Sequence, residues 1–494
     1  MRKHLYFGIR LICFTLILLC LIYKTNEILT PKKFFDNEWP TTTTYKGFYQ
    51  MKPGSTDVLF LGSSHIASGF IPQLIYNTKG IQSYNLGCEQ QNMLVSYYWL
   101  KEALRYQQPK VVVLDTNMLF DYINVEPLNT LEPCTRMAMC AMKWSGVKWD
   151  GVNSISKHDP QQTISSYILT NIRFHNRWTS LEEQDFVSHK MERHYELKGY
   201  TPLSSVGENY IYLDYSPFSD DFSADLAEVN PLMKEYFEKT VDLCNNTGII
   251  LLLVKTPNSD WTPEKHNTVK DLAGGYGINF IDFNEKNTYE DCGLIYAEEM
   301  HDNDHCNIWG AEKLTYYLAE YLDSNFNLSN DTHPEQWADT NEYYKEIYHD
   351  CQIKHIDNIN EYIDMIDEDR YTIMIASQGK MGSFVTDEIS SSFRKLGLSF
   401  DAKTDESYCA SIGEGYIYEN HGPDTIRHTG STRRKNTDYI ITAVNGNPDK
   451  QCSILIANKE KAKAKDGINI VVYNNETWKI VDSMCLDADG EIIR

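Results

Sequence analysis

A serine follows directly on an apolar segment near the start of the chain. Residues 56–61 read Thr-Asp-Val-Leu-Phe-Leu, and the run 62–65, Gly-Ser-Ser-His, comes next. A glycine at a strand end lets the backbone turn sharply, and Ser64 then heads a helix whose free N–H groups favour negative charge. A nucleophilic serine needs that environment, because an oxyanion forms beside it. An ordinary turn would read the same way, and Ile66 replaces the second glycine of a Gly-x-Ser-x-Gly elbow.

An Asp–His pair far downstream supplies the missing base. Asp302 precedes His305 by three residues, just before a long helical segment. An Asp in this position can orient one imidazole nitrogen while the other accepts the serine proton. An acidic surface turn is one alternative. A calcium loop is another, but Cys306 replaces an expected Asp or Asn and Lys313 replaces the bidentate Glu. The sequence predicts Ser64 as nucleophile, His305 as base and Asp302 as the group that orients it.

The elements that must position these residues alternate between strands and helices. Short apolar runs predict five strands, at 56–61, 83–87, 110–114, 249–254 and 278–282, and helical spacing predicts helices at 91–106, 235–245 and 307–325. Such a pattern indicates an α/β fold, a flavodoxin-like three-layer parallel sheet. Ligands bind beyond the carboxyl ends of its strands. We expect residues 120–230 to form an inserted cap of short helices over that edge.

Three segments together resemble the SGNH/GDSL superfamily over residues 55–328. They are the strand leading into Leu61-Gly62-Ser63-Ser64-His65, the run Tyr84-Asn85-Leu86-Gly87, and Asp302-x-x-His305-x-Asn307-x-x-Gly310. The resemblance implies that Ser64 is the nucleophile and that Asp302 and His305 complete a catalytic triad. It also implies an oxyanion hole made by the backbone N–H groups of Ser64 and Gly87 and by an Asn after the third strand.

That Asn is where the chain departs from the family. The usual Gly-x-Asn-Asp block is absent, and Asn117, three residues after Leu114, is the candidate in its place. Ser63 also replaces the Asp of Gly-Asp-Ser. These departures resemble the membrane-anchored branch of the superfamily, which includes proteins of alginate and exopolysaccharide O-acetylation and of D-alanyl-lipoteichoic acid transfer.

Membership of that branch implies a function outside the membrane. The expected activity is ester hydrolysis or O-acyl transfer on a cell-surface glycan through an acyl-serine, without a cofactor and beside a membrane-bound O-acyltransferase. The alternative is a non-catalytic glycan-binding or assembly protein that uses the SGNH fold as a scaffold, and the missing Asn block favours it. Within the insert, residues 174–178, Phe-His-Asn-Arg-Trp, resemble uncharacterised surface SGNH-like proteins of Gram-positive bacteria. His175 and Arg177 could bind an anionic or sugar substrate, or could anchor the cap by packing and pairing.

The chain changes character after Leu328. A polar linker at 329–342 precedes a second domain at 343–494 of mixed α and β structure. Its segments 371–376, 386–398, 407–413 and 467–473 resemble the interleukin-like epithelial–mesenchymal-transition-inducer (ILEI-type) domain. That resemblance implies a non-enzymatic, carbohydrate-binding module and carries no catalytic residues.

Composition limits the remaining functions. The hydrophobic content of 42% and aromatic content of 12% indicate folded domains, and a net charge of −23 argues against binding to nucleic acid. The twelve cysteines are irregularly spaced and show no zinc pattern, so we expect no metal site and mostly single buried thiols.

The N-terminus carries the clearest physical signal. Residues 5–23 are apolar except for Arg10 and Thr15, and they span roughly 28 Å as a helix, close to the thickness of the hydrocarbon core. Basic residues precede this segment, which predicts a single-pass anchor at 1–24 with a cytoplasmic N-terminus, a spacer at 25–54 and the remainder outside the cell membrane. A cleaved signal peptide is the alternative, although no small-x-small site follows the apolar run.

Overall fold

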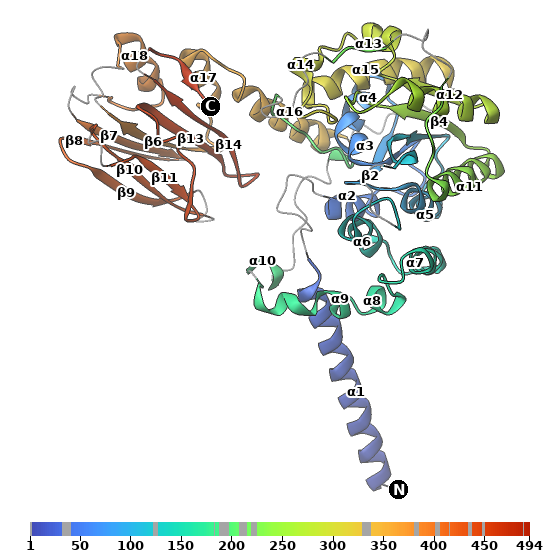
Figure 1. The fold of residues 1–494 in the computed structure, drawn as a ribbon. Coiled ribbons are helices and arrows are strands. Elements are labelled where there is room, and N and C mark those ends of the chain that lie inside the picture. Colours follow the sequence, from blue (N-terminus) through green and yellow to red (C-terminus); the bar gives the residue numbers. More distant parts are fainter. Residues whose placement is uncertain are drawn as a thin grey trace. The chain divides into compact units, whose positions relative to one another are not determined.

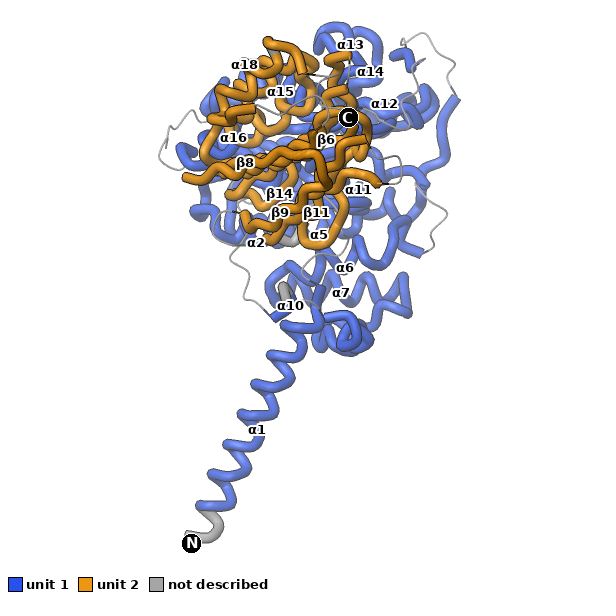
Figure 2. The backbone as a smooth tube through the Cα atoms, turned by 90° about the vertical axis from the view of Figure 1, so that its left-hand side faces the viewer, with its two compact units in different colours: residues 1–344 blue, residues 345–494 orange. Residues whose placement is uncertain are grey.

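The computed structural model divides the chain into two compact units, residues 1–344 and 345–494 (Figure 2). Each unit has its own core and is treated by itself. Part of the expected linker, residues 329–336, lies outside the described residues. The structure describes residues 2–31, 41–121, 127–181, 183–186, 197–206, 215–218, 225–328, 337–379, 385–400, 406–413, 415–432, 437–446, 450–487 and 489–494.

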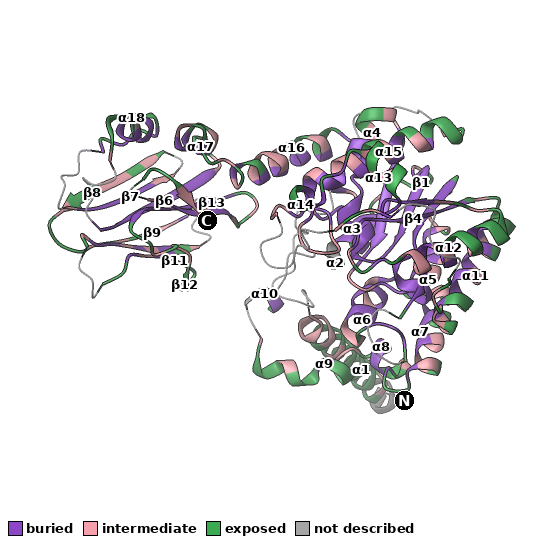
Figure 3. Ribbon diagram, turned by 45° about the horizontal axis from the view of Figure 1, so that its top comes forward, coloured by how far each residue is buried: buried purple, intermediate pink, exposed green. Residues whose placement is uncertain are grey.

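A five-stranded parallel sheet forms the centre of the first unit. Its strands are β1 (Val58–Gly62), β2 (Ser83–Gly87), β3 (Val111–Asp115), β4 (Ile250–Lys255) and β5 (Asn279–Asp282). Their order is β2-β1-β3-β4-β5, and every neighbouring pair is parallel. The predicted mixed α/β architecture with a parallel sheet is confirmed. Strands β1, β2 and β3 are buried along their whole length, which is why they appear as continuous apolar runs (Figure 3).

Helices cover both faces of this sheet. Leu59 and Leu61 of β1 belong to a core that includes buried residues of α5 (Met93–Ala103) and α11 (Pro231–Thr247). The next residue along, Phe60, points to the opposite face, where its ring stacks on Phe70. The helices of the first unit that complete these layers are α2 (Thr41–Phe48), α3 (Ser64–Gly69), α4 (Pro72–Lys79), α12 (Pro263–Tyr276), α13 (Lys286–Cys292), α14 (Tyr296–Glu299) and α15 (Ile308–Asn325).

Short helices occupy the described part of the insertion between β3 and β4. They are η1 (Asn117–Leu119), α6 (Glu132–Ala141), α7 (Gly146–His158), α8 (Ile164–Ile168), α9 (Asn171–Phe174), η2 (His175–Thr179) and α10 (Glu183–Phe186). The later segment 197–206 lies beside the sheet: the Lys198 carbonyl accepts a hydrogen bond from Asn85 N at 2.9 Å, and Thr201 N donates to the Ala67 carbonyl at 2.7 Å. This segment therefore runs along β2 and α3.

The N-terminal helix α1 (Arg2–Leu29) is apolar and exposed (Figure 1). Residues 6–29 are long and apolar enough to cross a membrane, and none of that stretch is buried. It is the one such helix in the described part of the chain. A signal sequence would meet the same criteria of length and composition, so the helix supports membrane association without fixing which side the rest of the chain lies on.

The second unit is an α+β domain. It contains the larger part of helix α16 (Ala338–Ile353), the helices α17 (Ile359–Ile366) and α18 (Asp387–Lys395), and two antiparallel sheets. One has the order β15-β14-β13-β6-β7-β8 and the other β12-β11-β10-β9. Alternate residues of the central strand β6 enter two cores, Ile373 on the side of α17 and α18 and Met374 on the side of β10. The strands are β6 (Tyr371–Gln378), β7 (Ser407–Gly413), β8 (Tyr416–Gly422), β9 (Ile426–Ser431), β10 (Asp438–Ala443), β11 (Ser453–Ile456), β12 (Lys459–Glu460), β13 (Gly467–Asn474), β14 (Lys479–Leu486) and β15 (Ile492–Ile493).

Candidate active site

The strand order creates a natural binding crevice beyond β1 and β3. From β1 the chain passes to β2 on one side and then crosses to β3 on the other. In open parallel sheets this reversal leaves a crevice at the carboxyl ends of the two strands. Gly62 and Asp115 are the last residues of β1 and β3, so the Gly-Ser-Ser-His run begins at that point.

Gly62 and Asp115 shape the turn that carries Ser64. Gly62 has φ +152°, and a Cβ atom there would clash with the Cβ of Asp115, so only glycine fits. The Asp115 carboxylate accepts hydrogen bonds from Ser63 Oγ at 2.6 Å and from Ser63 N at 3.3 Å. Ser63 is the N-cap of α3, and its hydroxyl accepts from His65 N. Ser64 is thus held at the first helical position by residues on both neighbouring strands.

Ser64, His305 and Asp302 form a continuous hydrogen-bonded row. Ser64 Oγ lies 2.7 Å from His305 Nε2. On the other side of the ring, Nδ1 lies 2.9 Å and 3.0 Å from the two carboxylate oxygens of Asp302. The three predicted triad residues therefore meet, although 241 positions separate Ser64 from His305.

Local hydrogen bonds fix the loop that presents His305. Asp302 Oδ1 accepts from the backbone N–H of Asp304 at 3.0 Å and of His305 at 2.8 Å, which closes a tight turn. Asn307 then caps α15 through Trp309 N and Gly310 N, each at 3.1 Å. A Cβ at Gly310 would clash with the Glu299 carbonyl, so the glycine allows α15 to pack closely there. The downstream motif thus has a structural explanation for each of its residues.

The charges around His305 keep it basic. Burial lowers the pKa of this imidazole, but the hydrogen bond to Asp302 and the nearby Asp304 carboxylate outweigh burial, and the pKa is raised. For Asp302, burial raises the carboxyl pKa, yet the hydrogen bond to His305 lowers it overall. At neutral pH, Asp302 is therefore ionised, and the ring can take a proton from Ser64 and hold it.

A second buried network lies beside the triad. The sequence indicated that one of its members, Lys255, faces the site region as a local electrostatic contributor, but it did not indicate the contacts within the network. His65 Nδ1 lies 3.0 Å from Lys255 Nζ and 2.9 Å from Thr256 Oγ1, both at the end of β4. On the other side of the ring, Nε2 lies 3.9 Å from Asp304, whose other oxygen is 3.7 Å from His305 Nδ1. Asp304 is thus flanked by two imidazoles whose ring centres are 5.2 Å apart.

Electrostatics assign charges within this network. Lys255 is fully buried, and burial lowers its pKa to about 8. Burial and the Lys255 charge together lower the pKa of His65, so this ring is neutral at pH 7. Since the Lys255 ammonium can only donate, His65 Nδ1 accepts, and the ring proton resides on Nε2 facing Asp304. The hydrogen bond from His65 in turn helps hold the pKa of Asp304 well below its usual range, against the opposing effect of burial.

His65, Asp304 and His305 also lie close enough to share a metal ion, with ligand atoms within 4.8 Å of one another. Two observations favour a proton-linked network instead. Both ring nitrogens of His305 already contact Ser64 and Asp302, and a buried ammonium, that of Lys255, lies against His65. A cation at this position would repel that ammonium, so the residues present do not suit a metal site.

The other predicted oxyanion donors lie at the same edge of the sheet. Gly87 ends β2, paired with Gly62, and a Cβ on Gly87 would come within 2.9 Å of the Ser63 carbonyl. Asn117 begins η1, nearly buried, and its N–H donates to Asp115 at 3.0 Å. Their roles beside Ser64 stay predictions.

His175 and Arg177 belong to η2, which packs against α1. Arg177 donates to the Leu29 carbonyl at 2.8 Å and binds the buried Asp185 through both carboxylate oxygens. His175 Nδ1 lies 3.0 Å from the Ile172 carbonyl. These contacts match the anchoring role, whereas the substrate-binding role gains no support from them.

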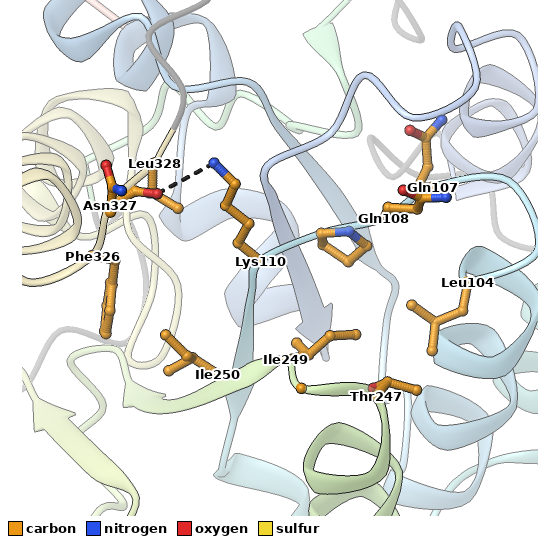
Figure 4. Close-up of a pocket in the computed structure, with 12 residues that line it drawn as sticks. Leu104, Gln107, Gln108, Lys110, Thr247, Ile249, Ile250, Phe326, Asn327 and Leu328 are labelled. Carbon is orange, nitrogen blue, oxygen red and sulfur yellow. Dashed lines mark hydrogen bonds between the residues drawn. The ribbon is translucent and has the colours of Figure 1, made fainter.

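Two hollows differ in their relation to the triad. One, of about 590 Å³, lies at the amino end of the sheet, where Lys110 Nζ donates to the Asn327 carbonyl at 3.2 Å (Figure 4). Because ligands of such sheets bind at the carboxyl edge, this hollow is in the wrong place for the triad. The other, of about 430 Å³, is lined by residues 259–263 after β4 and by Tyr215, Ser216 and Phe218. Its wall joins the His305 loop, since Ser259 N donates to the Asn303 carbonyl.

Taken together, the geometry places a hydroxyl, a base and an orienting carboxylate in the arrangement used for acyl transfer. A scan against protein-family models found no match for this chain, and a search of curated proteins found none either.

Proposed function

We propose that the first unit is an SGNH-type serine esterase or O-acyltransferase. The observation that carries the proposal is the Ser64–His305 contact of 2.7 Å, with His305 held from behind by Asp302. The doubly wound strand order, with Ser64 at the point where that order reverses, supports the SGNH assignment.

In the proposed reaction, Ser64 Oγ attacks the carbonyl carbon of an acyl ester while its proton passes to His305 Nε2. Asp302 stabilises the imidazolium that forms. The oxyanion is stabilised by the N–H groups of Ser64 and Gly87 and by the Asn117 side chain. The tetrahedral intermediate expels the alcohol, which takes the proton from His305, and an acyl-serine remains. Water or a sugar hydroxyl then attacks the acyl-serine, giving its proton to His305, and Ser64 leaves with that proton.

The proposed setting is the outer face of a cell membrane. The apolar helix α1 would anchor the chain, with its basic N-terminal residues in the cytoplasm and both units outside. The substrate would be an acylated cell-surface polysaccharide, with the second unit as a glycan-binding module and a membrane-bound O-acyltransferase as the partner. The hollow beside the His305 loop offers room for part of such a substrate.

Hydrolysis of para-nitrophenyl acetate tests the proposal. We expect Ser64→Ala to reduce the rate to background. Ser68→Ala is the matched control, since Ser68 is a buried serine of the same helix whose hydroxyl bonds the backbone rather than His305. Equal rates for the wild type and Ser64→Ala would refute the assignment. Adding glycerol as an acceptor separates the two activities, because a transferase forms glyceryl acetate at the expense of free acetate.

The second candidate is a non-catalytic glycan-binding scaffold. It is favoured by Asp115, which directly follows Leu114 where the usual Gly-x-Asn-Asp block would be and whose carboxylate accepts a hydrogen bond from Ser63. Binding of a polysaccharide that survives Ser64→Ala, in a protein without measurable esterase activity, would support this candidate.

A further inference from the structure

Large apolar side chains are exposed on the short helices α8 to α10 of the insertion. Within nineteen positions, five such side chains have exposed fractions of 37–71%: Ile168, Leu169, Ile172, Trp178 and Phe186. We call these five residues the apolar face. Scattered single apolar residues are normal on a protein surface, but a group along consecutive elements indicates a binding surface.

The elements that carry this face are fixed to the end of α1. Asn171 N donates to Asn26 Oδ1 at 3.0 Å, and the hydroxyls of Thr30 and Thr170 lie 2.6 Å apart. Arg177 adds its bond to the Leu29 carbonyl. Figure 1 shows α8, α9 and α10 lying across this end of the helix. The apolar face is therefore continuous with the end of the helix that is long and apolar enough to span a membrane.

The charge of this region also differs from that of the whole chain. Residues 131–186 contain six Lys or Arg and six Asp or Glu, so the stretch is neutral in a chain of net charge −23. A neutral surface is not repelled by anionic headgroups, whereas the remainder of the chain is. Tryptophan and phenylalanine are also the side chains that favour the boundary between headgroups and acyl chains.

We propose that the apolar face lies on the bilayer that holds α1, with Trp178 and Phe186 inserted at the headgroup–acyl boundary. The occupant of this surface is the lipid itself. The contact would fix the orientation of the first unit relative to the membrane, since α1 alone would leave it free to turn. The proposal rests on α1 spanning the membrane, as in the proposed function, and is independent of the chemistry at Ser64.

Quenching of tryptophan fluorescence by brominated lipid tests this inference on the full-length protein in phosphatidylcholine vesicles. The bromine is placed near the top of the acyl chains. We expect Trp178→Phe to remove a large part of the quenchable emission. Trp478→Phe is the matched control, because Trp478 is also highly exposed, at 62%, but is not part of the apolar face, and we expect its loss to leave the quenched emission unchanged.

Three results would overturn the inference. The first is emission from Trp178 that is unaffected by bromine while the protein stays in the vesicles after an alkaline wash. The second is a blue-shifted but unquenched Trp178, which would indicate a protein partner on the face. The third is release of the protein from the vesicles by the wash, which would show that α1 does not span the bilayer. None of these depends on ester hydrolysis, so failure of the catalytic proposal is measured separately, by the rate of the same preparation on para-nitrophenyl acetate.

Discussion

Replacing Asp302 by Asn tests whether Asp302, rather than Asp304, is the carboxylate that orients His305. Asp302 contacts Nδ1 at 2.9 Å and 3.0 Å, whereas Asp304 approaches no closer than 3.7 Å. The asparagine oxygen can still accept the two backbone N–H groups of the turn, so the loop is retained. Its NH₂ group, however, would donate to Nδ1 and shift the ring proton to Nε2. His305 could then no longer accept the proton of Ser64.

The expected loss of kcat/KM in Asp302→Asn has two contributions. An imidazolium and a carboxylate about 4 Å apart attract each other by about 4 kcal/mol at an effective dielectric constant of 20 and by about 1 kcal/mol in water. Because the Asp302 side chain is 34% exposed, solvent screening reduces this attraction to about 1–2 kcal/mol. The wrong tautomer adds the larger loss, so kcat/KM for an acetyl ester should fall about 10²- to 10⁴-fold, or about 3–5 kcal/mol.

The assay compares Asp302→Asn with Asp304→Asn on para-nitrophenyl acetate across pH. We expect the second variant to lose less than about tenfold, because Asp304 acts on His305 through its charge rather than as the orienting group. Since that charge raises the His305 pKa, its removal should move the acid limb of kcat/KM to lower pH. Equal losses in the two variants, or a loss below about tenfold in Asp302→Asn, would refute the reasoning.

Further predictions concern the buried network and the turn. Lys255 lowers the pKa of both His65 and His305, so Lys255→Met should move the acid limb of kcat/KM to higher pH, opposite to Asp304→Asn; an unchanged limb would contradict this. Lys255→Met also leaves nearby buried carboxylates without the ammonium that neutralises them, so it should lower the free energy of unfolding, measured in urea, by about 3 kcal/mol. A variant as stable as the wild type would contradict this. Gly62→Ala should destabilise the first unit by about 2 kcal/mol through its clash at Asp115, whereas Gly274→Ala, a helical position with open space, should be neutral or stabilising in the same thermal melt.

The sheet and the triad were predictable because their signals are local. Strands buried on both faces leave continuous apolar runs, and Ser64 and His305 each lie next to an element boundary that can be read from such runs. The resemblance to a family then ordered these residues along the chain. Strands β8 and β9 gave no such signal, since they are half-exposed and mix polar residues with apolar ones.

The second network was harder to predict because its partners come from different elements. The position of Lys255 at the end of a predicted strand indicated that it faces the site region and contributes to its electrostatics, but its contact with His65 depends on the parallel pairing of the strands. Burial of that lysine is a tertiary property with no local sequence pattern. The role of Asp115 was not predicted either: the sequence showed only that the usual Gly-x-Asn-Asp block is missing there, whereas in the structure the Asp115 carboxylate holds Ser63 in place.

Covalent labelling with a fluorophosphonate tests the central claim most directly, because the probe reacts with a serine only where a base activates it. The account predicts one modified residue, Ser64, found by peptide mass mapping of the full-length protein, and loss of that label in Ser64→Ala and in His305→Gln. Labelling that persists in Ser64→Ala, or that is absent from the folded wild-type protein, would contradict it.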